Sequence, residues 1–337
     1  MNEQVQIVYE QVNKIAILLR SSRFPERYEP ANENLRIANS KINLANAYLA
    51  IVAICHQTSP IGERQLEGFI STNYRKGWDY LKEKLLHAAI LDPNWADPKF
   101  WQYLTPTILS ELYKDKDKGC TLSRVNERTF LLNNLGEGLI HDGFLRIEDA
   151  ISSLDYIVGG DNGFIRYLSR YEAYSDPLNK KTSLFLSLAE TECGWKYQDP
   201  ENIHSPIDYH ELRGHLRLGT VYVVDERIKL KLINHLPISI EDDLTIRKVV
   251  QDTNEYLSRV VGVSAIELHY FLWNIFRSCC SRQVGQTHCI CCSEECSLPE
   301  PYKILPYYHS CCIFHELCPS INDINKVIEP PYIGHFY

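Results

Sequence analysis

The feature that most constrains the fold is a cysteine-rich segment near the end of the printed sequence. Nine of the twelve cysteines lie between Cys279 and Cys318, in forty residues with little apolar content. A stretch of this kind buries too little apolar surface to hold a shape, whereas metal–thiolate bonds can close a loop of this length. Soft thiolates at this density select zinc or an iron–sulfur cluster. The segment therefore predicts a metal site that staples a loop.

Two ligand sets are compatible with the cysteine spacing. The first is a contiguous C-x8-C-x2-C-x3-C site made of Cys280, Cys289, Cys292 and Cys296. The second joins Cys280 and one cysteine of the 289–296 group to a C-x5-C pair, Cys312 and Cys318. The thiols that remain suffice for a second site of the zinc type. The spacing leaves both sets open.

The composition is that of an ordinary globular protein without a membrane span. Hydrophobic residues make up 45% and charged residues 23% of the 337 positions,. The longest apolar run, Ala47–Cys55, is too short to cross a bilayer. The first twenty residues predict an amphipathic helix rather than a signal peptide, and abundant cysteines without an export signal favour a reducing compartment. We therefore expect a cytoplasmic protein, and the sequence does not indicate its oligomeric state.

Apolar residues recur at helical spacing along most of the chain. The patterns predict helices over 3–20, 35–55, 64–71, 75–91, 97–112, 123–141, 240–261 and 263–278. The clearest strand candidate is the short run VYVV at 221–224,. These patterns predict an all-α protein with negligible sheet.

A lysine pair begins one of the apolar helices. Lys181 shares a face with apolar side chains three, four and seven residues further on,. An amine on a core-facing stripe is costly, so it indicates either a function or a salt bridge. Lys180 lies about 100° round the same helix, which favours solvent exposure or phosphate binding. Lys181 is therefore the candidate nucleophile of the two.

An aspartate begins a second helix, 27 residues after Lys181. Asp208 shares a face with Leu212 and Leu216, and the helix dipole at such a position favours its ionised form. Aspartate is also a common N-cap residue, and capping is compatible with a catalytic role. Tyr209 follows directly at the start of the same helix. Asp208 is therefore the candidate catalytic carboxylate.

Two polar residues directly follow the apolar helix predicted over 35–55. The loop HQTSPIGE at 56–63 begins with His56 and Gln57. Polar side chains at such a helix end can line a substrate site, or they can serve only as helix caps. We keep both residues as candidate substrate contacts.

The order of these features resembles that of the helix-hairpin-helix DNA glycosylase superfamily, whose endonuclease III branch ends in a four-cysteine [4Fe–4S] loop. KKT at 180–182 resembles the catalytic Lys-Thr step of that family, and IDYHELRGHL at 207–216 resembles its catalytic-aspartate helix. FRSCC at 276–280 and CIFHELC at 312–318 resemble the ends of the cluster loop. The chain departs from the family where YSDPLNKK lacks a Gly-x-Gly turn before the lysine, and where His309 replaces a cluster cysteine.

A second, dispersed resemblance is to the queuosine salvage proteins, which are helical N-glycosidases acting on queuosine nucleotide. Residues Ile207–Val223, ISIEDDLTIRKVV and AIELHYFLW are similar to their Asp-Tyr-Arg, Glu-Ile-Arg and Leu-Trp helices, and PPYIGHFY is similar to their aromatic C-terminus. His210 replaces the arginine of the first motif, and those proteins lack the cysteine loop. Both groups of relatives cleave an N-glycosidic bond.

The resemblances imply a two-lobed, DNA-glycosylase-like helical region over 1–278 with its active site between the lobes. A cysteine-rich metal loop over 279–318 and a tail over 319–337 would follow. Asp208 would stabilise the positive charge that develops on the sugar, and Lys181 would form a Schiff base that adds lyase activity. The substrate contacts would come from His56, Gln57, Lys180 and Tyr209.

The resemblances also imply a cofactor and a partner. The cofactor would be a [4Fe–4S] cluster, or alternatively zinc. The partner would be DNA carrying a modified or damaged base, in base excision or in defence against foreign DNA. The net charge of −8 and the absence of a basic tract favour a modified nucleotide instead, because phosphate neutralisation supplies most non-specific affinity for DNA,. A third alternative is a non-catalytic, metal-bearing protein that binds nucleic acid.

Overall fold

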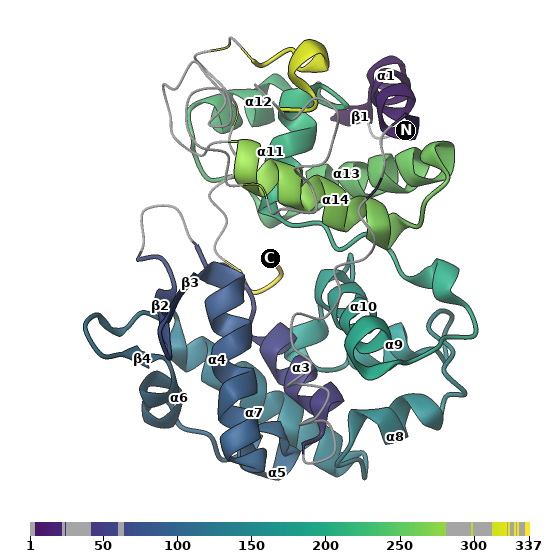
Figure 1. The fold of residues 1–337 in the computed structure, drawn as a ribbon. Coiled ribbons are helices and arrows are strands. Elements are labelled where there is room, and N and C mark those ends of the chain that lie inside the picture. Colours follow the sequence, from purple (N-terminus) through teal and green to yellow (C-terminus); the bar gives the residue numbers. More distant parts are fainter. Residues whose placement is uncertain are drawn as a thin grey trace. The chain divides into compact units, whose positions relative to one another are not determined.

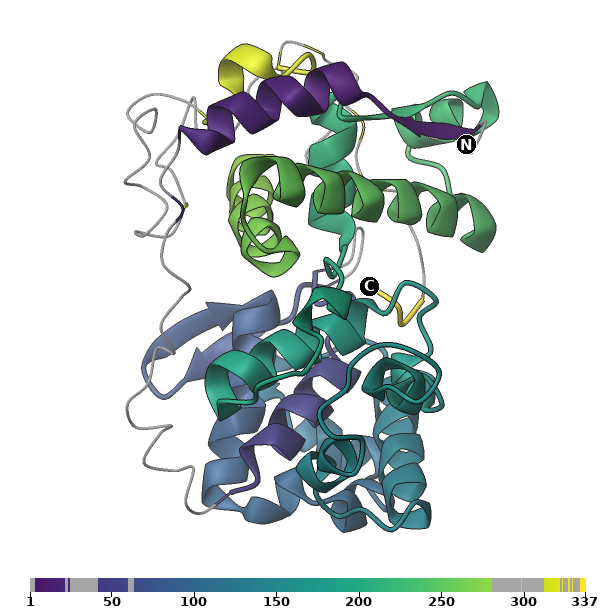
Figure 2. The ribbon, with the colours of Figure 1, turned by 90° about the vertical axis from the view of Figure 1, so that its right-hand side faces the viewer.

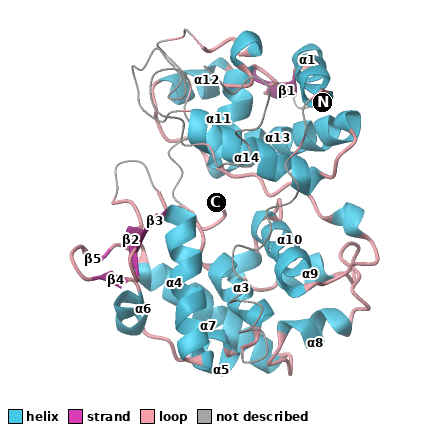
Figure 3. Ribbon diagram, viewed as in Figure 1, coloured by secondary structure: helices cyan, strands magenta, loops and turns pink. Residues whose placement is uncertain are grey.

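The structure is a computed structural model, and it describes residues 4–21, 24, 42–59, 64–280, 298, 312–321, 323, 327, 329 and 334–337. Helices dominate these residues, and their strands form only two-stranded antiparallel pairs (Figure 3). The predicted all-α class is therefore confirmed for the described part of the chain. Within the same ranges, no helix combines the length and the apolar content needed to cross a bilayer.

The chain divides into two compact units that do not follow sequence order. Unit 1 comprises Met1–Glu29 and His204–Ile333, and unit 2 comprises Pro30–Ile203 and Gly334–Tyr337. The candidate carboxylate, Asp208, belongs to unit 1, whereas Lys181 belongs to unit 2. Each unit therefore carries its own part of the predicted site.

Unit 2 is built around the helix α3, whose ten residues are all buried. The sequence of α3, LANAYLAIVA, is apolar all round, as suits a helix with neighbours on several sides. The elements of this unit are α3 (Leu44–Ala53), β2 (Glu67–Ile70), β3 (Asn73–Lys76), α4 (Gly77–Leu91), α5 (Pro98–Trp101), α6 (Pro106–Leu112), β4 (Lys114–Asp115), β5 (Gly119–Cys120), α7 (Val125–His141), α8 (Ile147–Ser152), α9 (Phe164–Leu168) and α10 (Lys180–Cys193) (Figure 1). Helices α4, α7, α8 and α10 pack against α3.

Unit 1 is a bundle of helices with one short strand pair. Its elements are β1 (Val5–Ile7), α1 (Tyr9–Arg20), α11 (Tyr209–Leu218), β6 (Val221–Val223), α12 (Glu226–Ile233), α13 (Ile240–Val261) and α14 (Ala265–Cys279). Helix α1 lies along α13 (Figure 2). Helix α11 approaches α14 closely at Gly214, because a Cβ atom there would overlap the ring of Phe276. This close packing fixes the start of α11 relative to α14.

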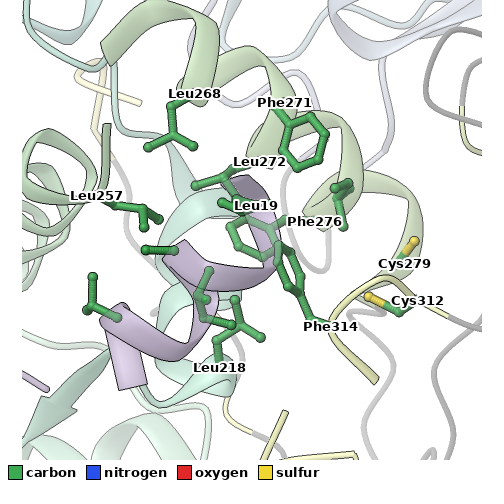
Figure 4. Packing of buried hydrophobic residues seen from close by; sticks show 14 of the residues in the cluster. Leu19, Leu218, Leu257, Leu268, Phe271, Leu272, Phe276, Cys279, Cys312 and Phe314 are labelled. Carbon is green, nitrogen blue, oxygen red and sulfur yellow. The ribbon is translucent and has the colours of Figure 1, made fainter. Parts of the chain in front are cut away.

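The core of unit 1 gathers apolar side chains from α1, α11, α13 and α14 (Figure 4). Two cysteines of the cysteine-rich segment, Cys279 and Cys312, belong to the same cluster, and each keeps less than a tenth of its surface exposed. Phe314 packs beside them and is fully buried. The described residues at both ends of the cysteine-rich segment are therefore anchored in one hydrophobic core.

The predicted helix over 64–71 is wrong, because β2 occupies residues 67–70 and pairs with β3 in a hairpin. Ser71 turns the chain with a φ of 55°. The backbone N–H of Phe69 donates to the side chain of Asp115 at 2.8 Å. In a helix, this N–H would donate instead to the carbonyl oxygen four residues earlier. Four residues are too few to separate a helical period from strand alternation.

The predicted helix over 97–112 is interrupted and forms α5 and α6. Pro98 and Pro106 each begin a helix, and the side chains of Asp97 and Thr105 accept from backbone N–H groups in the first turns. Proline suits the first helical position because its missing N–H would have no partner there. The single predicted helix is therefore divided into two, each with its own N-cap and proline.

The N-terminal predictions are corrected in two places. Residues 5–7 of the helix predicted over 3–20 form β1, in which Val5 lies opposite Val223. The strand predicted at 221–224 is confirmed as β6. Its hydrogen bonds to residues 5–7 favour a strand over a helix there. In the helix predicted over 35–55, the structure shows α3 from Leu44 to Ala53. Residues before Ile42 in that prediction lie outside the described ranges.

Candidate functional site

Asp208 is the N-cap of α11. Its Oδ1 atom accepts from the backbone N–H of His210 at 2.7 Å and of Glu211 at 3.3 Å. Its Oδ2 atom accepts from the indole Nε1–H of Trp273 on α14 at 2.7 Å. Three N–H donors and the positive end of the helix stabilise the ionised carboxylate. The N-cap role predicted for Asp208 is confirmed, and its side chain remains partly exposed.

Aromatic rings and a cation lie close to the contact between Asp208 and Trp273. The ring of Tyr209 lies 4.4 Å from that of His210, and the His210 ring meets Trp273 edge-on at 5.9 Å and 86°. The guanidinium of Arg277 lies 4.8 Å from the centre of the Trp273 ring. The three rings are partly exposed and Arg277 is exposed. A negative charge, flat rings and a cation therefore share one solvent-accessible region of unit 1.

Sequence reasoning missed Trp273 and Arg277 as members of this site. The segment AIELHYFLW contains Trp273 and carried one of the resemblances, but its spacing does not indicate which side chain the indole contacts. Asp208 and Trp273 are 65 residues apart. Their contact depends on how α11 packs against α14.

A buried polar network holds α11 in place behind the carboxylate. Glu211 is fully buried and accepts from the side-chain amide of Asn254 at 2.7 Å and from His269 at 2.8 Å. The same amide of Asn254 also donates to Ser205 at 3.1 Å. Buried polar groups are costly unless they are paired, so this network favours one position of the helix. The network thereby restricts the position of Asp208.

Lys181 occupies a different environment, in the interior of unit 2. Its Nζ atom donates to the carbonyl oxygen of Ala53, the last residue of α3, at 2.6 Å. The side chain is fully buried, and its amine forms no ion pair with a carboxylate among the described residues. Burial lowers the pKa of Lys181 to about 7. The amine caps a helix C-terminus, where orphan carbonyls and the dipole both favour a donor.

Arg128 caps the same end of α3, and sequence reasoning did not identify it. Its guanidinium is fully buried and donates to the carbonyl oxygens of Ile54, His56 and Ser123, the last two at 2.7 and 2.8 Å. Arginine suits this task because its planar fork presents several donors at once. Lys181 and Arg128 together satisfy the buried carbonyls where α3 ends.

The prediction that Lys180 faces solvent is wrong, because only 7% of its surface is exposed. Its Nζ atom donates to the sulfur of Cys55 at 3.5 Å, and its backbone N–H donates to Asp176 at 2.9 Å. The first turn of α10 packs against the end of α3, so both lysines are covered. A helical wheel of α10 alone cannot show this, because it does not include α3, which covers the side of α10 that carries Lys180,.

His56 and Gln57 lie at the same end of α3. His56 is fully buried, and burial, followed by the charge of Arg128, holds its pKa well below the usual value. Neither ring nitrogen of His56 has a hydrogen-bond partner among the described residues. The side chain of Gln57 accepts from Arg124 at 2.6 Å, and Arg124 also donates to the carbonyl of Gly334 at 2.9 Å. His56 therefore belongs to the interior of unit 2, whereas Gln57 is partly exposed.

Lys181→Met is expected to change the pH dependence of stability. The lowered pKa of Lys181 means that the unfolded chain binds more protons than the folded protein between pH 7 and about pH 10,. Stability should therefore rise with pH in this range, by on the order of 2 kcal/mol between about pH 7 and pH 9. The variant lacks this gain but keeps the neighbouring charged and titratable groups Asp176, Lys180, Arg128 and Cys55.

Urea unfolding of the wild type and of Lys181→Met at several pH values measures this difference. Lys116→Met removes an exposed lysine of the same unit and serves as the matched control, which should follow the wild type. Parallel curves for the wild type and Lys181→Met would show that the amine is not neutralised by burial.

The predicted metal ligands are only partly within the described residues. Cys280, Cys312 and Cys318 are described, whereas Cys289, Cys292 and Cys296 lie outside the described ranges. Among the described residues, no group of three His, Cys, Asp or Glu side chains is placed to hold a metal ion. Three of the six predicted ligands therefore lie within the described residues, and the metal site stays a prediction.

Comparison with known proteins does not place the sequence in a family. No protein-family model matches it, and no curated protein matches it. The functional assignment therefore depends on the chemistry of the residues around Asp208.

Proposed function

We propose that the protein is an N-glycosylase that excises a modified base from DNA, with Asp208 as its catalytic carboxylate. One observation carries this proposal: the Asp208 carboxylate accepts hydrogen bonds from three N–H donors, and the residue remains partly exposed beside aromatic rings. A carboxylate used only as a helix cap needs no such surroundings. Glycosidic cleavage needs a stable negative charge next to a surface on which a base can stack.

Asp208 would act on the sugar as its bond to the base breaks. The electron pair of the N-glycosidic bond leaves with the base, and positive charge develops on the sugar. A nearby carboxylate stabilises that charge and accepts a proton from the water whose oxygen bonds to the anomeric carbon. The departing base takes up a proton from solvent, which completes the hydrolysis. Fixed N–H donors keep Asp208 ionised and aligned during these steps.

The aromatic rings would hold the base. Tyr209 and Trp273 are partly exposed beside Asp208, and a base rotated out of a duplex is commonly stacked between such side chains,. Arg277 adds a positive charge at the same surface, where it suits a phosphate group,. These three residues would select a flat, anionic substrate without recognising a particular nucleotide sequence.

Hydrolysis of a free modified nucleotide is the second candidate function. It is favoured by the bond between Asp208 and Trp273, because that bond joins the two segments that resemble helices of the queuosine salvage proteins. The net charge of −8 also suits a small substrate better than a long polyanion,. Chromatographic detection of released base, with modified DNA duplexes and with nucleoside monophosphates as parallel substrates, separates the two candidates. Binding of DNA without any base release would instead support the non-catalytic alternative.

Borohydride trapping on abasic DNA tests the role of Lys181. Its contacts are sufficiently explained by the cap on α3, so we expect the wild type and Lys181→Gln to yield equally little covalent adduct. An adduct that forms in the wild type and disappears in Lys181→Gln would assign Schiff-base chemistry to this amine. That outcome would extend the proposed function to a lyase step.

The cofactor proposed from the cysteine spacing is a [4Fe–4S] cluster, with zinc as the alternative. Its role would be to staple the cysteine-rich segment rather than to act on the substrate. Metal analysis and a visible absorption spectrum of the purified protein distinguish the two, because only the cluster absorbs visible light. We expect about four iron atoms per chain, and zinc in their place would establish the alternative.

A further inference from the structure

His210, two residues after the candidate carboxylate, is held by a buried arginine. The Nη2 atom of Arg213 lies 2.7 Å from the Nδ1 atom of His210, one turn apart on α11. A guanidinium can only donate hydrogen bonds, so Nδ1 must accept with its lone pair. The ring proton of His210 is therefore on Nε2, and the imidazole is neutral. A second ring proton would set two donors against each other.

Arg213 cannot turn away from this contact, because its other donors are also engaged. Only 1% of its surface is exposed, and its Nη1 atom forms an ion pair with Glu329 at 2.5 Å. Its Nε atom donates to the carbonyl of Cys280 at 3.0 Å. A buried arginine with a fixed carboxylate and a fixed carbonyl has a single available orientation. The tautomer of His210 is therefore imposed by the interior of unit 1.

The ring of His210 lies within the candidate site. It meets Trp273 edge-on at 5.9 Å, and the backbone N–H of the same residue donates to Asp208. Because Nδ1 is directed at the buried Arg213, Nε2 on the opposite side of the ring is directed away from it. Trp273 thus contacts both the His210 ring and the proposed catalytic carboxylate, and a neutral imidazole N–H in such a site is an electrophilic donor of the kind that polarises a substrate oxygen or nitrogen,.

We propose that His210 is a second catalytic residue, which donates a hydrogen bond from Nε2–H to an acceptor atom of the leaving base. This inference rests on the proposed N-glycosylase function and specifies its substrate as a base with a ring nitrogen or carbonyl oxygen near the scissile bond. As the bond breaks, its electron pair moves onto the base and this hydrogen bond strengthens. His210 keeps its Nε2 proton throughout. The proton released by the attacking water is accepted by Asp208. Arg213 and Glu329 are positioning residues.

Variants of His210 test this assignment through base release. His210→Ala removes the donor and should lower kcat about a hundredfold with little change in KM. The side-chain amide of His210→Gln offers an N–H near the position of Nε2, so this variant should keep kcat within about tenfold of the wild type. His204→Ala, which removes a partly exposed histidine of the same unit, is the matched control and should equal the wild type. Wild-type kcat in His210→Ala would overturn the proposal.

Nuclear magnetic resonance of 15N-labelled histidines tests the tautomer without any substrate. Two-bond correlations should show His210 with a proton on Nε2 and a bare Nδ1 throughout the neutral pH range. The double variant Arg213→Met, Glu329→Gln removes the positioning pair without leaving a buried charge, and it should yield a mixture of tautomers and a lower kcat. If this double variant does not fold, the wild-type spectrum and the rescue by His210→Gln decide the matter.

The outcomes separate this inference from the proposed function. An active wild type whose His210 carries its proton on Nδ1, or carries two protons at neutral pH, overturns the inference and leaves the function standing. A wild type that releases no base from any DNA or nucleotide substrate overturns the proposed function and the inference with it.

Discussion

Asp208→Asn is expected to lower kcat for base release by about 10²- to 10³-fold. The substitution removes the negative charge that would stabilise the sugar in the transition state but barely changes the size of the side chain. Asparagine is as good an N-cap as aspartate, so its oxygen can keep the bonds to the N–H groups of His210 and Glu211,. Loss of the bond from Trp273 should cost about 1 kcal/mol of stability. The fold should therefore persist while the chemistry fails.

The matched control for this prediction is Asp225→Asn. Asp225 is the N-cap of α12 and accepts from the N–H groups of Arg227 and Ile228, so the substitution makes the same chemical change at an equivalent position. The control should release base at the wild-type rate, and circular dichroism should show both variants folded. Equal kcat for Asp208→Asn and the wild type would contradict a catalytic role and leave Asp208 as a helix cap.

Arg128→Met is expected to lower the free energy of unfolding by about 2–6 kcal/mol. Methionine fills much of the same volume but donates no hydrogen bond. The carbonyls of Ile54 and His56 would then be buried at the end of α3 with a donor removed. A buried polar group without a partner costs about 1–3 kcal/mol, and the substitution affects these two buried carbonyls besides that of Ser123, which is only partly buried. Since α3 is the central helix of unit 2, the loss should affect the whole unit.

Urea denaturation followed by circular dichroism measures this loss. Arg166→Met replaces an exposed arginine on α9 of the same unit and should change stability by no more than about 0.5 kcal/mol,. A similarly small effect of Arg128→Met would mean that other donors reach the end of α3. It would also remove the structural explanation offered for Lys181, which caps the same helix end.

Local sequence signals predicted the long helices and their ends. Helices α13 and α14 lie within one or two residues of the predicted 240–261 and 263–278, because apolar spacing is sustained over many turns in both,. Ser239 and Ser264 cap their starts, and Gly262 ends α13 in the left-handed conformation. Short segments were less predictable: the hairpin over 67–76 has too few residues to show a period.

The candidate site likewise combines features set by local interactions with features set by distant ones. The N-cap position of Asp208 is a local property, since it needs only an aspartate before an apolar helix, and the sequence was sufficient to predict it. Two further contacts of the site are not local: Trp273 is 65 residues from Asp208, and Glu329, which pairs with Arg213, is 116 residues from it. No spacing rule spans such distances.

Burial was likewise decided by tertiary packing. Lys181 and its acceptor Ala53 are 128 residues apart, and Lys180 is covered because α10 lies against the end of α3. Sequence alone therefore determined the long helices and where a carboxylate caps one helix, because these depend on neighbours within a turn or two. Only the packing of the helices decided which charges are buried and which rings surround Asp208, since those contacts join residues that are distant in the chain.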